Sequence, residues 1–310
     1  MNKQGKSPAN GADKAIIFDI QHNAVVDGPG IRTTVFFKGC NMRCRWCQNP
    51  EGLEPVRHAV WLENRCLHCG TCMKEAVPGQ LEEKEGRIIP NRSYDGDFDR
   101  LVHDCPTGAL CYDSRIYTTE ELMNEIRRDE VFFRHGGGVT FSGGEPLLHW
   151  KAMKEVLQMC READIKTAIE TALFADPEAV REVLPLLDEV FADFKCRDDN
   201  RHREITGVSN ALIMCNLEYV LENAQGTVTI RTPLIPGYTA SHENIAGIAS
   251  FLAALRPDVT YELLNYNELA PAKYKLTGMI YEPGDRKRFS DAEMEKFRST
   301  ARENGLRNVI

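Results

Sequence analysis

The stretch IRTTVFFKGCNMRCRWCQNP, residues 31–50, decides the fold. Its first half is a run of β-branched and aromatic residues, which is typical of a buried β-strand. The run passes without a break into Cys40, Cys44 and Cys47, three cysteines within eight residues. Three thiolates can bind three irons of a 4Fe-4S cluster and leave the fourth iron open, whereas a structural zinc site requires four closed ligands. On this motif alone, zinc and unligated thiols stay open as alternatives.

Five further runs of this kind predict buried strands, and they begin at Gly137, Lys166, Glu189, Thr227 and Val259. Helix-like stretches accompany them, with start signals at Thr118 and Glu121, at Asp176 and Pro177, and at Ser290 and Glu293. Strands that alternate with helices form a parallel sheet. We therefore expect an α/β fold, built as an open doubly wound sheet or as a complete or partial β/α barrel.

Residues 55–115 interrupt this alternation and hold a second group of cysteines. Cys66, Cys69 and Cys72 keep the two-residue spacing of a bacterial ferredoxin, but Ala76 stands where the fourth cysteine is expected. Either this site is inactive or its fourth ligand lies elsewhere. We interpret the whole segment as an inserted metal-binding module.

The fourth ligand follows from the pattern of a two-cluster ferredoxin, in which the fourth cysteine of each run ligates the other cluster. Counting back from Cys105, which precedes a proline, the places of a second cysteine triplet hold Leu101, Phe98 and Asp95. The four ligands of one cluster are therefore missing together, and those of the other remain. We predict one auxiliary 4Fe-4S cluster bound by the first triplet and Cys105. Cys111 is the alternative fourth ligand, and zinc is the alternative metal.

Composition excludes some classes of partner. Lys plus Arg number 38 against 46 Asp plus Glu, and the net charge of -8 argues against nucleic acid or an anionic membrane as the main partner. Residues 1–14 form a polar tail without a secretory signal, and no run approaches the roughly 18 apolar residues of a membrane span. We expect a cytoplasmic protein, in which the 11 cysteines serve metal or redox chemistry rather than a disulfide framework.

The longer segment DGPGIRTTVFFKGCNMRCRWCQNPE, residues 27–51, resembles the radical S-adenosylmethionine (SAM) superfamily and, within it, the glycyl-radical-enzyme activating enzymes. The resemblance implies that Cys40, Cys44 and Cys47 bind a 4Fe-4S cluster whose open iron chelates SAM. An electron from that cluster cleaves SAM to methionine and a 5′-deoxyadenosyl radical. The radical then takes a hydrogen atom from a backbone glycine of a partner glycyl radical enzyme.

The resemblance also implies the architecture and the partners. The fold becomes a partial (β/α)6 TIM-like barrel over residues 15–54 and 116–310, with a ferredoxin-like insert at residues 55–115. A low-potential donor such as flavodoxin or ferredoxin supplies the electron under anaerobic conditions, and the protein is expected to be a monomer.

Several residues at the ends of the predicted strands match family motifs that bind SAM. Gly143, Gly144 and Glu145 match the GGE motif, in which the glycines let backbone approach the ligand and the motif holds the amino group of SAM. Asp193 and Lys195 match the DxK motif. Two charges in a barrel mouth are costly unless a ligand or each other satisfies them, and a structural ion pair is the alternative.

The remaining SAM contacts implied by the resemblance are more isolated. Glu170 lies near a site for SAM or a monovalent cation, a site that Asp193 shares, and Arg231 lies at the mouth. Trp46 stands where the family has an aromatic residue near the adenine, although core packing is equally open. Asn267 stands where many relatives have a histidine near the adenosine, and asparagine can form hydrogen bonds but cannot be cationic.

Two further motifs resemble those of the family. Residues Asp27, Gly28, Pro29, Gly30 and Arg32 form the segment expected at the barrel mouth where the partner's glycine loop enters, with an ordinary β-turn as the alternative. Residues 202–207 match an HxxxTG segment, and we assign no catalytic role to its histidine, His202.

Two other functions stay open. One is a radical SAM enzyme that acts on a small molecule or on another peptide. The other is an electron-transfer or zinc-bound interaction module, which the GGE and DxK motifs disfavour because an electron carrier needs no carboxylate to bind an ammonium group.

Overall fold

The computed structural model describes residues 14–310, except for the side chains of residues 275 and 276. The chain forms two compact units, one that ends at Pro55 and resumes over Ile116–Ile310, and one over Val56–Arg115. The predicted tail lies outside the described residues apart from Lys14, where the first strand begins. Among the described residues, no helix is long and apolar enough to cross a membrane.

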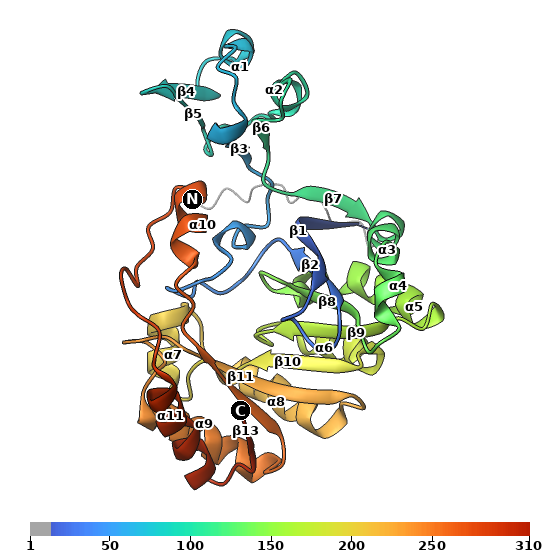
Figure 1. Ribbon diagram of the computed structural model, residues 1–310, viewed down its shortest axis with the longest axis vertical. Helices are drawn as coiled ribbons and strands as arrows, with labels where there is room; N and C mark the ends of the chain where they lie inside the picture. Colours follow the sequence, from blue (N-terminus) through green and yellow to red (C-terminus); the bar gives the residue numbers. More distant parts are fainter. Residues whose placement is uncertain (1–13) are drawn as a thin grey trace. The chain divides into compact units, whose positions relative to one another are not determined.

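The larger unit contains a nine-stranded sheet in the order β13-β12-β11-β10-β9-β8-β2-β1-β7 (Figure 1). All the strands predicted from the sequence are present as parallel neighbours in chain order. They are β2 (Arg32–Phe37), β8 (Gly138–Gly143), β9 (Lys166–Thr171), β10 (Glu189–Asp193), β11 (Thr227–Leu234) and β12 (Thr260–Asn265). The predicted α/β fold with a mostly parallel sheet is therefore confirmed.

Three strands at the sheet edges were not predicted. They are β1 (Lys14–Ala24), which pairs antiparallel with β2, β7 (Arg115–Thr118), and β13 (Asn308–Val309), which pairs parallel with β12. β1 is buried only in its first half and then alternates in exposure, because an antiparallel strand can present one face to water. β7 and β13 are too short to produce a periodic pattern in the sequence.

Helices of the larger unit connect the strands. They are α3 (Thr119–Arg127), α4 (Glu130–Phe133), α5 (Trp150–Glu162), α6 (Pro177–Val183), α7 (Asp199–Thr206), α8 (Ala211–Asn223), α9 (His242–Leu255), α10 (Ala270–Thr277) and α11 (Asp291–Glu303), with the 3-10 turns η1 (Pro50–Gly52), η3 (Pro146–His149) and η4 (Leu184–Leu186). The predicted capping boxes at Thr118 and Ser290 and the side-chain cap at Asp176 are all confirmed.

Alternation along the strands gives the sheet two different faces. One face carries Val35, Phe37, Val139 and Phe141, which lie with helix side chains in the main hydrophobic core. The other, which we call the polar face, carries the alternate residues of the same strands, listed here from β2 to β12: Arg32, Thr34, Thr140, Ser142, Glu170, Phe191, Asp193, Arg231 and Glu262. Strand register sets Arg231 beside Asp193 on one side and Glu262 on the other.

The smaller unit has two short antiparallel pairs and little else that is regular. The elements are β3 (Ala59–Trp61) with β6 (Leu110–Tyr112), β4 (Leu81–Lys84) with β5 (Arg87–Pro90), η2 (Glu63–Arg65), α1 (Thr71–Glu75) and α2 (Asp99–His103). Its hydrophobic core contains Phe98 and Leu101, and Ala76 packs against it. These are three of the four positions at which the ligands of a second cluster are missing.

Candidate functional site

The first cysteine group lies on the loop between β2 and η1, at the carboxyl end of the parallel strands. Backbone hydrogen bonds from Gly39 N to Gly52 O (2.8 Å) and from Cys40 N to Leu53 O (3.1 Å) close this cysteine loop. Burial and, to a lesser extent, the neighbouring thiols raise the pKa of Cys44 to about 11 and that of Cys47 to about 12. The three thiols therefore lie close together and are protonated at neutral pH. A metal would have to displace their protons on binding.

Gly143 and Gly144 are required by the close approach of β8 to the cysteine loop. A Cβ on Gly144 would lie 2.3 Å from the Gly39 carbonyl oxygen and 2.6 Å from that of Gly52, and one on Gly143 would lie 2.5 Å from the backbone of Phe37. Real Cβ atoms do not come this close to backbone, so only glycine fits. Gly144 approaches the backbone of the cysteine loop and Gly143 approaches that of β2, whereas the sequence suggested that both approach a ligand.

The Glu145 carboxylate points into the protein. It is 0% exposed and accepts hydrogen bonds from Thr171 Oγ1 (2.7 Å), Ala172 N (2.9 Å) and Leu147 N (3.2 Å). Burial raises its pKa, and these three bonds oppose that rise. A carboxylate has about four acceptor sites, so one remains after the carboxylate has fixed the loop after β9.

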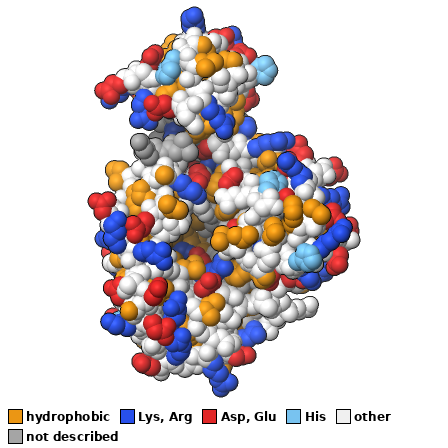
Figure 2. All heavy atoms as spheres, viewed as in Figure 1, with side chains coloured by type: hydrophobic (Ala, Val, Ile, Leu, Met, Phe, Trp, Pro, Cys, Tyr) orange, Lys and Arg blue, Asp and Glu red, His pale blue; other side chains and the backbone are white. Residues whose placement is uncertain are grey.

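Arg231 links two carboxylates on the polar face. Its guanidinium donates to Glu170 (2.6 Å) and to Glu262 (2.7 Å), and its central carbon lies 3.8 Å from the ring centre of Phe191. Ser142 Oγ donates to the other oxygen of Glu170 (2.6 Å). Burial raises the pKa of Glu170, while Arg231 and Ser142 oppose that rise. Figure 2 shows the larger unit hollowed near the middle, with charged side chains of both signs at the margin.

Asp193 and Lys195 form an ion pair of 2.8 Å at the end of β10. Burial works against the charge on Lys195, but Asp193 and the nearby thiols of Cys44 and Cys40 hold its pKa above the usual range. Lys195 is thus a buried cation near the first cysteine group. The ion pair with Asp193 satisfies a charge that would otherwise be costly to bury.

The carboxyl end of α7 holds the cysteine loop from the other side. The amides of Arg43 and Arg45, on either side of Cys44, donate to the carbonyls of Thr206 (2.7 Å) and Ile205 (3.1 Å). Gly207 ends the helix with a φ of +82° in the left-handed region. This explains the HxxxTG segment as a support for the loop.

Four cysteines of the smaller unit meet at one cavity. Its volume is about 100 Å³, and its lining includes Cys66, Cys69, Cys72 and Cys105. Cys111 is not among the described residues that line it. By a similar measure a single water needs about 10–15 Å³, so the cavity has room for a group of several atoms.

Comparison with known families settles the affiliation of the chain. Residues 34–248 match the model of the Radical SAM superfamily. The chain belongs to the radical SAM superfamily. Its sheet, cysteine loop and polar face are those of a radical SAM protein, and the family implies a 4Fe-4S cluster with SAM as its ligand.

Relatives place this radical SAM protein among the activating enzymes. It is 36% identical to the indoleacetate decarboxylase activating enzyme of Tractidigestivibacter scatoligenes, over 97% of this chain and 98% of that protein. It is also 36% identical to the choline trimethylamine-lyase activating enzyme of Oleidesulfovibrio alaskensis, over 93% of this chain and 95% of that protein. It therefore belongs to the glycyl-radical-enzyme activating family.

A solved structure agrees with the fold. SuiB of Streptococcus suis bound to the precursor peptide SuiA matches with a TM-score of 0.52 at 16% identity, over 87% of this chain and 46% of that chain. At this identity the match concerns the fold alone.

The segment Asp27 to Arg32 borders the polar face at the start of β2. It precedes β2, so it lies at the amino end of that strand, roughly 17 Å along the strand from the cysteine loop at the other end. Thr34 Oγ1 donates to Asp27 (2.7 Å) and so holds it on the polar face. The Arg32 guanidinium is 0% exposed and donates to the Pro29 carbonyl (3.2 Å), so it supports the segment from within.

Two predicted SAM contacts have other neighbours in this radical SAM fold. Trp46 is 3% exposed and packs with Ile205 and Tyr266, with the ring of Tyr238 centred 5.7 Å away. Asn267 is exposed, and its side chain accepts from Leu269 N (3.0 Å). Trp46 is therefore a core residue in this conformation, and Asn267 supports the turn before α10.

Sequence reasoning missed Glu262, Phe191 and Ser142. Glu262 is the single charged residue of the strand TYELLN, which is the signal that could have identified it. Ser142 and Phe191 lie at positions on the same face as the predicted Glu170 and Asp193. Period-two alternation would have placed both on the polar face.

Proposed function

We propose that this protein is an activating enzyme that uses SAM to remove a hydrogen atom from a backbone glycine of a partner glycyl radical enzyme. One observation carries the proposal. The three-cysteine loop is fixed against Gly144 of the GGE motif on one side and the end of α7 on the other, with a charged polar face beside it. The names of the relatives support the same activity.

The residues present fit a cluster with one open iron. Cys40, Cys44 and Cys47 would hold it, because three thiols on one loop closed by backbone hydrogen bonds supply three ligands and leave the fourth iron open. When bound, the cluster supplies the electron that cleaves SAM. The protein keeps Lys195 and Asp193 paired beside this loop, which excludes an unpaired charge from the reaction space.

The proposed SAM contacts remain those that the resemblance implied. They are Trp46, Gly143, Gly144, Glu145, Glu170, Asp193, Lys195, Arg231 and Asn267. The remaining acceptor site of Glu145 suits an ammonium group, whereas Trp46 and Asn267 have less support because one is buried and the other caps a turn. A monovalent cation near Glu170 and Asp193 would compete for these two carboxylates with Arg231 and Lys195, which pair with them.

The polar face is the proposed place for the glycine loop of the partner. Asp27 lies on it, and Gly28, Pro29 and Gly30 border it, while Arg32 holds this segment in place. In this interpretation the six parallel strands form a partial barrel with the polar face inside. We also predict that the protein is a cytoplasmic monomer and that it takes its electron from flavodoxin or ferredoxin.

The smaller unit is the proposed auxiliary-cluster module, with a ferredoxin-like origin. Its four cysteines line one cavity, and apolar residues occupy places of the missing second triplet. A zinc site would bring four sulfurs to about 2.3 Å from one point. Within residues 14–310 no group of three His, Cys, Asp or Glu side chains is placed to hold a single ion. The cavity has room for a group larger than a single ion, and zinc stays the alternative.

Metal content and SAM cleavage test this function. Anaerobically reconstituted protein should hold about eight irons per chain and, once reduced, should release 5′-deoxyadenosine from SAM. Cys44→Ala should abolish that release, and the exposed cysteine variant Cys215→Ala on α8 is the matched control. Reduced wild-type protein that never cleaves SAM would contradict the proposal, and a modified metabolite in place of a partner radical would favour the small-molecule alternative.

A further inference from the structure

Hydrogen-bond donors are directed at the sulfurs of the smaller unit. Leu110 N donates to Cys105 Sγ (3.3 Å), and His68 N donates to Cys66 Sγ (3.4 Å). The hydroxyl of Thr71 lies 3.4 Å from Cys69 Sγ, and that of Thr107 lies 4.0 Å from Cys105 Sγ. A cluster-bound thiolate has no proton, so these hydroxyls would be the donors.

The sulfurs of the cysteine loop receive fewer donors. Cys40 receives the amide of Met42, Cys47 receives that of Asn49, and Cys44 receives its own amide. The amides on either side of Cys44 are engaged elsewhere, because Arg43 N and Arg45 N donate to the carbonyls at the end of α7. Those two donors are thereby kept from the Cys44 sulfur.

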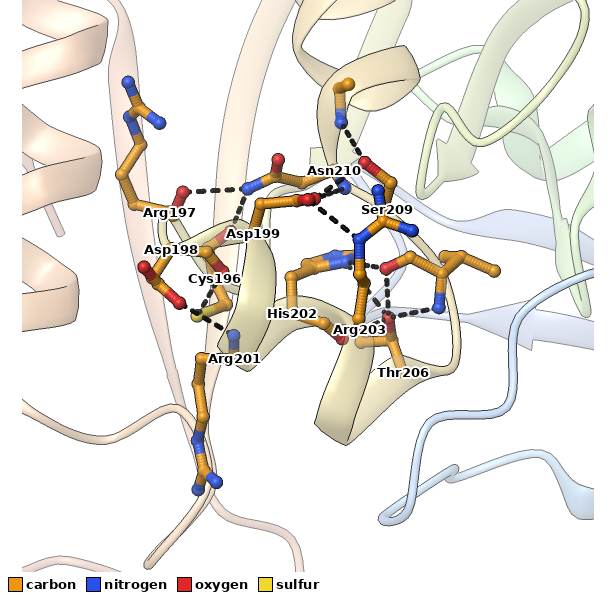
Figure 3. Close-up of polar contacts among 12 residues, drawn as sticks. Cys196, Arg197, Asp198, Asp199, Arg201, His202, Arg203, Thr206, Ser209 and Asn210 are labelled. Carbon is orange, nitrogen blue, oxygen red and sulfur yellow. Dashed lines mark hydrogen bonds and ion pairs between the residues drawn. The ribbon is translucent and has the colours of Figure 1, made fainter.

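A network of hydrogen bonds fixes the end of α7, as Figure 3 shows. His202 Nδ1 lies 2.7 Å from the Val208 carbonyl, which can only accept, so the imidazole carries its proton on that nitrogen. Thr206 Oγ1 donates to the His202 carbonyl (2.7 Å), and Asp199 accepts from Ser209 (2.7 Å) and Asn210 N (2.9 Å). This network holds the helix carbonyls toward the cysteine loop.

Donors to sulfur and exposure to water both raise the reduction potential of an iron-sulfur cluster, because they stabilise the more negative reduced state. The number of donors to sulfur and the exposure to water are both greater for the cysteines of the smaller unit than for those of the cysteine loop. Cys69 is exposed, whereas Cys66, Cys72 and Cys105 are partly buried, as are the three cysteines of the first group, so the difference in exposure arises from Cys69. The positive charge of Lys195 acts the other way on the first group, but Asp193 neutralises it at 2.8 Å.

We propose that the auxiliary cluster has a higher reduction potential than the SAM-binding cluster and is therefore reduced first. Each cluster takes one electron, passing from the 2+ to the 1+ state, from a low-potential one-electron donor. Electron transfer from the reduced auxiliary cluster to the SAM-binding cluster is then unfavourable, because the auxiliary cluster has the higher reduction potential. The electron that SAM cleavage consumes then enters at the cysteine loop, directly from the external donor.

This inference rests on the proposed function, since it requires both clusters. Its test is a reductive titration of the full reconstituted chain with dithionite, followed by electron paramagnetic resonance with and without SAM. SAM should alter the signal of the cluster with the open iron only. During the titration, we expect the signal that SAM leaves unchanged to appear before the SAM-sensitive signal. A SAM-sensitive signal that appears first would overturn the inference while leaving the proposed function intact.

Two threonine variants identify the cause. Thr71→Val together with Thr107→Val should shift the SAM-insensitive signal to lower potential and leave the SAM-sensitive signal in place. Thr119→Val, at the start of α3 in the larger unit, is the matched control and should shift neither signal. No shift in the double variant would overturn the role of these donors. About four irons and one signal in wild-type protein would instead overturn the assignment of the auxiliary cluster, and this inference with it.

Discussion

Replacing Arg231 with methionine tests the charge balance of the polar face. Arg231 donates to Glu170 (2.6 Å) and to Glu262 (2.7 Å) and lies over the ring of Phe191. Methionine keeps an apolar stem against that ring but removes the positive charge. Two carboxylates are then left close together without their shared partner.

The cost of Arg231→Met follows from the burial of these groups. Removing one partner of a fully buried ion pair costs about 3–5 kcal/mol. The side chains of Glu170 and Glu262 are 24% and 27% exposed, so water compensates in part. We expect the free energy of unfolding to fall by about 2–3 kcal/mol at neutral pH.

The pH dependence has a definite sign. Burial already raises the pKa of Glu170, and loss of Arg231 removes the main group that opposes the rise. A carboxyl whose pKa is higher in the folded state than in the unfolded state destabilises the protein as pH rises through the folded value. The destabilisation of Arg231→Met should therefore be full at neutral pH and shrink on acidification toward pH ~5.

Urea unfolding at neutral and acidic pH measures this effect. Arg302→Met is the matched control, because Arg302 is 43% exposed and pairs with Glu295 at 2.6 Å on the surface of α11. That pair should contribute less than about 1 kcal/mol. The reasoning is refuted if the two variants cost the same, or if the destabilisation of Arg231→Met grows as the pH falls.

Three further predictions concern residues around the two cysteine groups. Gly144→Ala should displace the cysteine loop and lower the iron content. It should also lower the free energy of unfolding by about 1–3 kcal/mol in a denaturant titration. Gly247→Ala, in the middle of α9, should be tolerated. Cys105→Ala should cost about four irons per chain by iron analysis, while Cys111→Ala should cost none. Glu145→Gln should lower stability by about 1–3 kcal/mol in a denaturant titration, because its amide group would face a backbone N–H; an unchanged stability would contradict the inward geometry.

The strands that could be predicted share one physical property. β2 and β8 to β12 each contribute an apolar face to the main hydrophobic core, so their residues form recognisable apolar runs. β1 was missed because much of it is exposed, and β13 because two residues carry no period. The short strands of the smaller unit were missed for the same reason.

The candidate site shows a different limit. The meeting of Cys105 with the first triplet at one cavity could be predicted because the rule that links the halves of a ferredoxin is a rule about sequence, while its role as a ligand stays a prediction. Glu262 could not be assigned, because its partner Arg231 lies 31 residues away in the chain and meets it only through strand register. The inward direction of Glu145 depends on the turn into η3, where its side chain caps Leu147 N. Such directions arise from tertiary packing, which no local pattern encodes.

The central claim is that this chain makes a glycyl radical on a partner. The most direct measurement mixes anaerobically reconstituted and reduced protein with SAM and with a glycyl radical enzyme as the candidate partner. Electron paramagnetic resonance of the mixture should show a glycyl radical signal on the partner, together with 5′-deoxyadenosine. Release of 5′-deoxyadenosine without any radical on such a partner would contradict the account.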